Sequence, residues 1–91
     1  MDVGVIGLAK LTLDLHEIYH KGAKIDAELE RVIDEAVARR IPMVEIIPGK
    51  GSGQLKKRVQ KFLQKKRIKQ RYHRVENDSN NSGRLFVHFR H

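Results

Sequence analysis

Val44-Glu-Ile-Ile-Pro-Gly-Lys-Gly-Ser-Gly53 leads from an apolar, strand-like run into a helix-like run that starts near Gln54. Its glycines, Gly49, Gly51 and Gly53, allow the backbone to turn at positive φ and to approach a ligand closely. The N–H groups at the start of a helix favour negative charge, and Lys50 adds a cation among the glycines. The segment therefore predicts an anion-binding loop, and the alternative is a tight strand-to-helix turn with Ser52 as the N-cap.

Two familiar phosphate-binding motifs are excluded by counting along this segment. A P-loop requires glycine where Val44 stands, and it requires Ser or Thr where Gly51 follows the lysine. The dinucleotide fingerprint G-x-G-x-x-G, started at Gly49, would need a third glycine at the position of Gln54. The loop therefore belongs to neither class of nucleotide-binding protein.

The chain before the glycine segment predicts a strand, a helix and a second strand. Residues 11–15 alternate apolar and polar side chains as a short strand that ends near His16. Apolar residues then recur at helical spacing from about residue 25 to residue 40, with acidic residues in the early turns and Arg39-Arg40 at the end, a pattern that suits the helix dipole. The run from Met43 to Ile47 is a candidate buried strand.

The chain after the glycine segment predicts a second helix and two more strands. Leu55, Val59, Phe62 and Leu63 mark an amphipathic helix, and a period of two beyond Lys66, through Ile68 and Tyr72, indicates a third strand. A polar turn over residues 76–83 precedes a last alternating strand near residues 85–89, which is antiparallel because its connection is short. Right-handed crossovers place both helices on one face of the sheet. The predicted fold is α/β (α+β), a two-layer βαβαββ sandwich with a mixed four-stranded sheet.

Composition limits the class of protein. The chain has 91 residues, enough for one small domain over residues 11–91 preceded by an N-terminal extension, residues 1–10. It has no cysteine, which excludes disulfides, a thiolate zinc site and a cysteine nucleophile, and favours an intracellular, cytoplasmic setting. No apolar run approaches the ~20 residues of a membrane span, so no membrane partner is expected.

The charge is divided between the two halves of the chain. Residues 1–48 carry six Lys/Arg and nine Asp/Glu, whereas residues 49–91 carry thirteen Lys/Arg and two Asp/Glu. The basic half begins at the glycine segment, which favours DNA or RNA as the partner over a merely solvated basic face. The expected nucleic-acid contacts are the glycine segment itself, residues 49–53, and four basic side chains after it: Lys56, Lys57, Lys61 and Arg71.

A candidate catalytic site follows from the predicted sheet. Ligands gather beyond the carboxyl ends of parallel strands, which brings the end of the first strand beside the glycine segment. His16 is a candidate general acid or base, Asp14 can orient it, and Lys50 with the loop amides can hold a phosphate whose charge grows in the transition state. Asp14 and His16 are two residues apart and point to the same side of an extended strand. The alternative is a structural carboxylate and an ordinary turn histidine.

Two motifs of this sequence resemble the motifs of a known protein family. Leu13-Asp14-Leu15-His16 followed, after a helix, by residues 46–53 resembles the small MutS-related (Smr) domain, whose hallmarks are an LDLH motif and an HGxG motif often extended as HGKGxG. The resemblance covers roughly residues 11–89. It implies a fold similar to the C-terminal domain of bacterial translation initiation factor three. It also implies nucleic-acid binding with endonuclease activity, nicking DNA or cleaving RNA, and it assigns Asp14, His16 and residues 49–51 to the two motifs.

The chain departs from the family pattern at two positions, which leaves three functions open. Glu17 follows LDLH where glycine is common, and Pro48 replaces the HGxG histidine, so one proton-transfer group or phosphate contact is missing. A nuclease, a binding module without catalysis in DNA repair, recombination or RNA handling, and a protein-interaction domain remain. No metal site is expected from the histidines; Mg²⁺, with Glu17 as a candidate ligand, is the one cofactor kept open.

Overall fold

The computed structural model describes residues 9–15, 18, 21–49, 53–78 and 83–90. The part of the chain that it describes forms four strands and three helices, in an order that follows the predicted pattern with one short helix added. The strands are β1 (Leu11–Asp14), β2 (Met43–Ile47), β3 (Arg74–Asn77) and β4 (Leu85–His88). The helices are α2 (Gly22–Ala38), α3 (Gln54–Leu63) and the short α4 (Lys66–Lys69).

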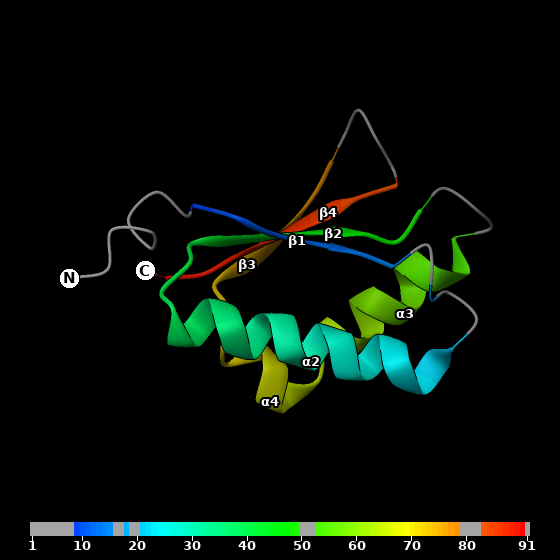
Figure 1. Ribbon diagram of the computed structural model, residues 1–91, viewed down its shortest axis with the longest axis horizontal. Helices are drawn as coiled ribbons and strands as arrows, with labels where there is room; N and C mark the ends of the chain where they lie inside the picture. Colours follow the sequence, from blue (N-terminus) through cyan, green and yellow to red (C-terminus); the bar gives the residue numbers. More distant parts are fainter. Residues whose placement is uncertain (1–8, 16–17, 19–20, 50–52, 79–82, 91) are drawn as a thin grey trace.

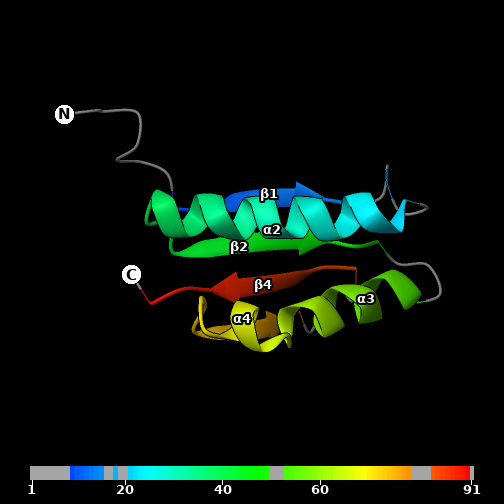
Figure 2. The ribbon, with the colours of Figure 1, turned by 90° about the horizontal axis from the view of Figure 1, so that it is seen from below.

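The strands form one mixed sheet in the order β1-β2-β4-β3. β1 pairs with β2 in parallel, whereas β4 is antiparallel to both β2 and β3. All three helices lie on one face of this sheet (Figure 1), with α2 over β1 and β2, and α3 and α4 over β4 and β3 (Figure 2). The two layers, the mixed four-stranded sheet and the antiparallel last strand confirm the predicted architecture.

The core lies between the two layers and follows the alternation of the strands. Leu13, Val44, Ile46, Leu85 and Val87 point from the sheet toward the helices and are buried. The helices meet them with apolar residues at helical spacing, all of them fully buried or nearly so: Ile25, Leu29, Val32, Ile33, Ala36, Val59, Phe62 and Leu63. This spacing turns one apolar stripe of each helix to the sheet and leaves the charged stripes exposed.

The first helix differs from the prediction at both ends. α2 begins at Gly22, three residues before the predicted start, and it ends at Ala38. The acidic residues therefore lie beyond the first turn and the arginines beyond the last, so the expected match with the helix dipole is wrong. The acidic residues of α2 instead form ion pairs with arginines, as described below.

The third strand begins later than predicted. The predicted strand through Ile68 and Tyr72 is wrong, because residues 66–69 form α4 and β3 starts only at Arg74. Ile68 and Tyr72 are four residues apart, a spacing that fits one face of a helical turn as well as a strand. Both are buried, and the Tyr72 hydroxyl donates a hydrogen bond of 2.8 Å to the carbonyl of Leu63. The residues at 76 and 77, predicted as turn, belong to β3.

None of the described helices covers the opposite face of the sheet, which we call the helix-free face (Figure 1). Alternation along the strands places Thr12, Glu45, Ile47 and Phe86 on this face. Glu45 is nonetheless only 5% exposed, because Lys10 and Arg84 fold over its carboxylate, at 2.9 Å and 3.0 Å. The helix-free face is therefore organised by a buried carboxylate and two cations.

Candidate phosphate-binding edge and basic helix surface

The ends of β1 and β2 lie side by side, as the sequence predicted. Asp14, the last residue of β1, is the register partner of Ile47, the last residue of β2. One residue further, the Leu15 N–H donates to the Ile47 carbonyl at 3.0 Å. Asp14 is exposed and follows the alternation that buries Leu13 and Leu15, so its side chain belongs to the helix-free face. His16 lies outside the described residues.

The glycine segment starts beside this edge, and its conformation requires glycine at two positions. Gly49 has φ of 93° and Gly53 has φ of 85°, which residues with a side chain rarely adopt. A Cβ built at either glycine meets no atom within 4 Å, so the backbone angle and not packing excludes other residues. Pro48 is buried. Lys50, Gly51 and Ser52 lie outside the described residues.

A main-chain hydrogen bond joins the glycine segment to the β3–β4 hairpin. The Gly49 N–H donates to the carbonyl of Gly83 at 3.2 Å. The hairpin thus forms a third wall of the edge, next to the segments that follow β1 and β2. Sequence reasoning treated residues 76–83 only as a polar turn, because nothing local in that segment indicates that β4 lies beside β2.

The start of α3 is electrically positive. Gly53 occupies the N-cap position, no described side chain caps the helix, and its first turn contains no acidic residue. The first N–H groups of a helix lack intrahelical partners and carry a partial positive charge. This helix end continues directly from the glycine segment and extends the positive potential of the edge.

Lysines run along the exposed side of α3. Lys57 and Lys61 are one i,i+4 step apart on α3, about 6 Å along the helix, and Lys65 follows just after this helix ends, at the N-cap position of α4. All three are exposed, and none of them makes an ion pair with a described residue. We call Lys57, Lys61 and Lys65 the lysine stripe. Lys56 is half-buried at a neighbouring position and is likewise unpaired within the described residues.

Three arginines of the same basic half form ion pairs with α2. Arg58 contacts Asp26 at 3.2 Å, Arg67 contacts Glu30 at 2.6 Å, and Arg71 contacts Asp34. The three carboxylates are four residues apart on α2, so they form one acidic stripe that faces α3 and α4. We call these three ion pairs the arginine ladder. Arg71, a predicted nucleic-acid contact, is thus ion-paired with α2, unlike the lysines of the stripe, which have no ion-pair partner among the described residues.

A groove lies between α2 and α3 beside the lysine stripe. Its volume is about 210 Å³, and it is lined by Asp26, Arg58, Lys61, Phe62 and Lys65. The Lys65 ammonium lies over the Phe62 ring, 5.1 Å from its centroid, and Arg58 is held by Asp26 and by the Gly22 carbonyl. The groove therefore separates the ladder, with its charges paired, from the stripe, with its charges exposed.

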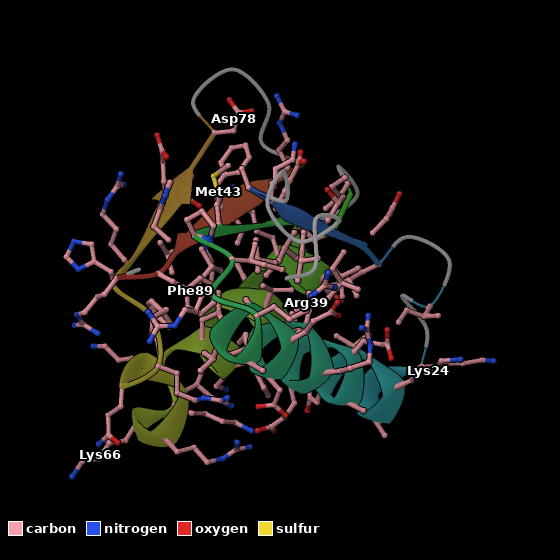
Figure 3. The ribbon with its side chains drawn as sticks, turned by 60° about the vertical axis from the view of Figure 1, so that its left-hand side comes forward. Lys24, Arg39, Met43, Lys66, Asp78 and Phe89 are labelled. Atoms are coloured by element: carbon pink, nitrogen blue, oxygen red, sulfur yellow. The ribbon has the colours of Figure 1, made fainter. Side chains whose placement is uncertain are left out.

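The hairpin brings a cation to the edge that sequence reasoning missed. Arg84 donates from Nε to Asp78 at 2.5 Å and from Nη1 to Glu45 at 3.0 Å. Asp78 lies on the side of the sheet away from the helices (Figure 3). The hydrogen bond from Lys10, followed by that from Arg84, lowers the pKa of Glu45, although burial opposes the shift. No sequence signal indicated this cluster, whose members come from four separate segments.

The part of the chain that the structure describes shows neither a membrane-spanning helix nor a cluster of metal ligands. No described helix combines the length and the apolar character needed to cross a bilayer. Within the same residues, no three or more His, Asp or Glu side chains are grouped so that they could hold a metal ion.

Comparison with known proteins identifies the family. The Smr domain model matches residues 13–90. Endonuclease MutS2 of Geobacillus sp. (strain WCH70) is 37% identical over 79 residues, which cover 76% of this chain and 10% of the relative. Endonuclease MutS2 of Leuconostoc citreum (strain KM20) is 43% identical over 65 residues, which cover 71% of this chain and 8% of the relative. The chain thus spans about a tenth of the length of the curated relatives it matches.

A solved structure gives the same answer for the fold. The Smr domain of Thermus thermophilus MutS2 matches with a TM-score of 0.66 and 20% sequence identity, covering 89% of this chain and 96% of that chain. At this identity the likeness concerns the fold, which agrees with the two-layer arrangement of β1, α2, β2 and α3. The residues that match the family model include the LDLH segment and the glycine segment, and the chain belongs to the Smr domain family.

Proposed function

We propose that this Smr domain binds the phosphate backbone of DNA or RNA and cleaves it at the edge formed by the ends of β1 and β2. The observation that carries the proposal is the contrast between the lysine stripe and the arginine ladder. Among the described residues, the lysine stripe has no ion-pair partner while the arginine ladder is neutralised by α2, so the stripe offers free positive charge beside the glycine segment. That charge begins where the glycine segment ends. Unpaired cations favour phosphate binding, because they replace counterions that the nucleic acid then releases.

The proposed chemistry uses two positions of the LDLH motif and the glycine segment. His16 transfers a proton to or from the reacting oxygens, and Asp14 orients it from the end of β1. Lys50 and the main-chain N–H groups of the glycine segment hold the phosphate and stabilise the charge that develops on it. The exposure of Asp14, its pairing with Ile47 and the positive φ of Gly49 support this assignment. The relatives named Endonuclease MutS2 support cleavage as the reaction.

Cleavage is tested by comparing two histidine variants. Purified wild type, His16→Ala and His73→Ala are incubated with supercoiled plasmid, single-stranded RNA and structured RNA, with and without magnesium. His73 is an exposed histidine just before β3, at the far end of the sheet, and serves as the matched control. Cleavage by the wild type and by His73→Ala, but not by His16→Ala, is the expected result. Cleavage that survives in His16→Ala would show that the reaction does not use this histidine.

A binding module without catalysis is the second candidate, and Pro48 favours it. Proline carries no titratable group and no N–H, so it cannot replace the family histidine as a proton donor or as a phosphate contact. If wild type and His16→Ala both bind nucleic acid and leave it intact, the module is the function. Absence of binding even at low salt would refute both candidates and leave a protein-interaction role.

A further inference from the structure

Arg84 lies on the same face of the sheet, and at the same edge, as the candidate catalytic Asp14. Leu85 pairs with Ile46 and Asn77, and Asp14 pairs with Ile47. One step further along the antiparallel register, Arg84 stands beside Ile47. Because side chains alternate along a strand, Asp14, Ile47 and Arg84 all belong to the helix-free face. Asp14 and Arg84 therefore flank Ile47, with their backbones two strand spacings, about 10 Å, apart.

Three neighbours fix the Arg84 guanidinium in place. Asp78 and Glu45 accept hydrogen bonds from its Nε and Nη1 atoms, at 2.5 Å and 3.0 Å. The guanidinium carbon lies 5.6 Å from the centroid of the Phe86 ring. Glu45 is itself buried and is held by Lys10 at 2.9 Å. A guanidinium held in this way loses little conformational freedom when it binds a further partner.

The fixed Arg84 guanidinium still has N–H groups that donate to no described residue. The Arg84 side chain is 41% exposed, and its Nη2 atom makes no hydrogen bond to a described residue. A guanidinium carries five N–H donors in one plane, and its free edge matches two oxygens of a phosphate. Lys10 and Arg84 together balance the charges of Glu45 and Asp78, so an added anion meets a neutral cluster with free N–H groups.

We propose that Arg84 binds a backbone phosphate of the nucleic acid on the helix-free side of the candidate site. This inference rests on the proposed function and extends it. The lysine stripe holds the strand on the helix side of the edge, and Arg84 holds it on the other side. The phosphodiester between them then lies at the edge beside the end of β2, one strand from Asp14. Arg84 is a binding and positioning residue and transfers no proton.

The test compares four variants in binding to labelled duplex DNA and single-stranded RNA over a salt series. Arg84→Gln removes the guanidinium. Arg84→Gln/Glu45→Gln removes the guanidinium and the carboxylate beneath it, so the net charge equals that of the wild type and Glu45 is not left with only one of its two cations. Arg74→Gln is the matched control, because Arg74 is an exposed arginine on the same face, beside Glu76 at 3.9 Å, at the opposite end of the sheet.

We expect both Arg84 variants to bind roughly three- to tenfold more weakly at low salt, with the slope of log K against log salt close to that of the wild type, because Glu45 and Asp78 already neutralise Arg84. Arg74→Gln should bind with the affinity of the wild type. Arg84→Lys, which keeps the charge and loses the planar fork, should keep the slope and lose affinity. A merely structural role for Arg84 would lower the melting temperature of the variants without a loss of affinity at temperatures where they are folded.

Two results would overturn the inference, and they are distinguishable. If the double variant unfolds cooperatively on heating, as a folded protein does, and binds with the affinity and slope of the wild type, Arg84 does not contact phosphate. The proposed function then stands. If the wild type itself does not bind either nucleic acid at low salt, the proposed function fails and the inference fails with it.

Discussion

Neutralising the lysine stripe should change the salt dependence of nucleic-acid binding much more than neutralising the arginine ladder. Two triple variants separate the two sets of charges, and each removes three positive charges from the same half of the chain. The first replaces the stripe with glutamine at Lys57, Lys61 and Lys65. The second replaces the ladder with glutamine at Arg58, Arg67 and Arg71. Net charge is therefore the same in both variants, and only the pairing of the removed cations differs.

The expected magnitude follows from the number of unpaired cations. Each phosphate contact contributes about 0.9 to the slope of log K against log salt on duplex DNA, so three lysines should lower the slope by about 2.7. Between about 50 mM and 200 mM salt, the affinity of the wild type should then fall about 40-fold more than that of the stripe variant. The ladder variant should keep nearly the whole slope, because each of its arginines is already neutralised by a carboxylate of α2.

Fluorescence anisotropy with a labelled duplex measures both slopes directly. Thermal unfolding of the same samples serves as the control, since the ladder joins α2 to α3 and α4 and its loss should lower stability, whereas loss of the exposed stripe should not. An equal decrease of slope in the two variants would refute the reasoning. It would mean that Arg58, Arg67 and Arg71 leave their carboxylates on binding and that ion pairing does not select the contacts.

Three further predictions concern single residues. Lys50→Ala should weaken binding to all sequences by a similar factor in competition assays, because a lysine among glycines contacts phosphate and not bases, and a change of sequence preference would contradict that role. Glu45→Gln should reduce the loss of stability that the protein shows in acid. The pKa of Glu45 is lowered in the folded state, so its contribution to stability is present above the usual glutamate pKa and is lost as pH falls through the lowered one. Urea unfolding of wild type and variant from pH 7 to pH 3 measures this difference. Arg40→Gly should raise the free energy of unfolding by about 0.5–1 kcal/mol, because Arg40 is exposed just after α2 with φ of 56°, and an unchanged urea midpoint would show that this backbone angle is not strained.

The sequence predicts the parallel part of the fold well. The alternation at Leu13 and Leu15, the helical spacing that follows and the apolar run of β2 each indicate one element, and the glycine segment marks the passage from strand to helix. These signals are local and agree with one another, so β1, α2, β2 and α3 were found near their observed bounds. The proximity of Asp14 to the glycine segment then follows from parallel pairing alone.

Where signals are ambiguous or lie far apart in the sequence, the structure is needed. Ile68 and Tyr72 fit both a strand and a turn of helix, and the structure places Ile68 within α4 and Tyr72 in the connection from α4 to β3. The arginine ladder joins residues 32 to 37 positions apart, and no pattern along the chain indicates which charges meet. The position of Arg84 depends on β4 lying between β2 and β3, whereas the short hairpin alone would also allow β4 at the edge of the sheet.

The hydrogen bond from Gly49 to Gly83 makes the hairpin an exchangeable part of the domain. The bond joins two main-chain groups, so it does not depend on which side chains the hairpin carries, and only a substitution such as Gly49→Pro removes its donor. Loop sequences grafted between Asp78 and Gly83 can therefore vary in length and charge while the attachment point remains. A library of sequences at these positions, screened for substrate choice, would change which nucleic acids bind at the edge and would leave the sheet unchanged.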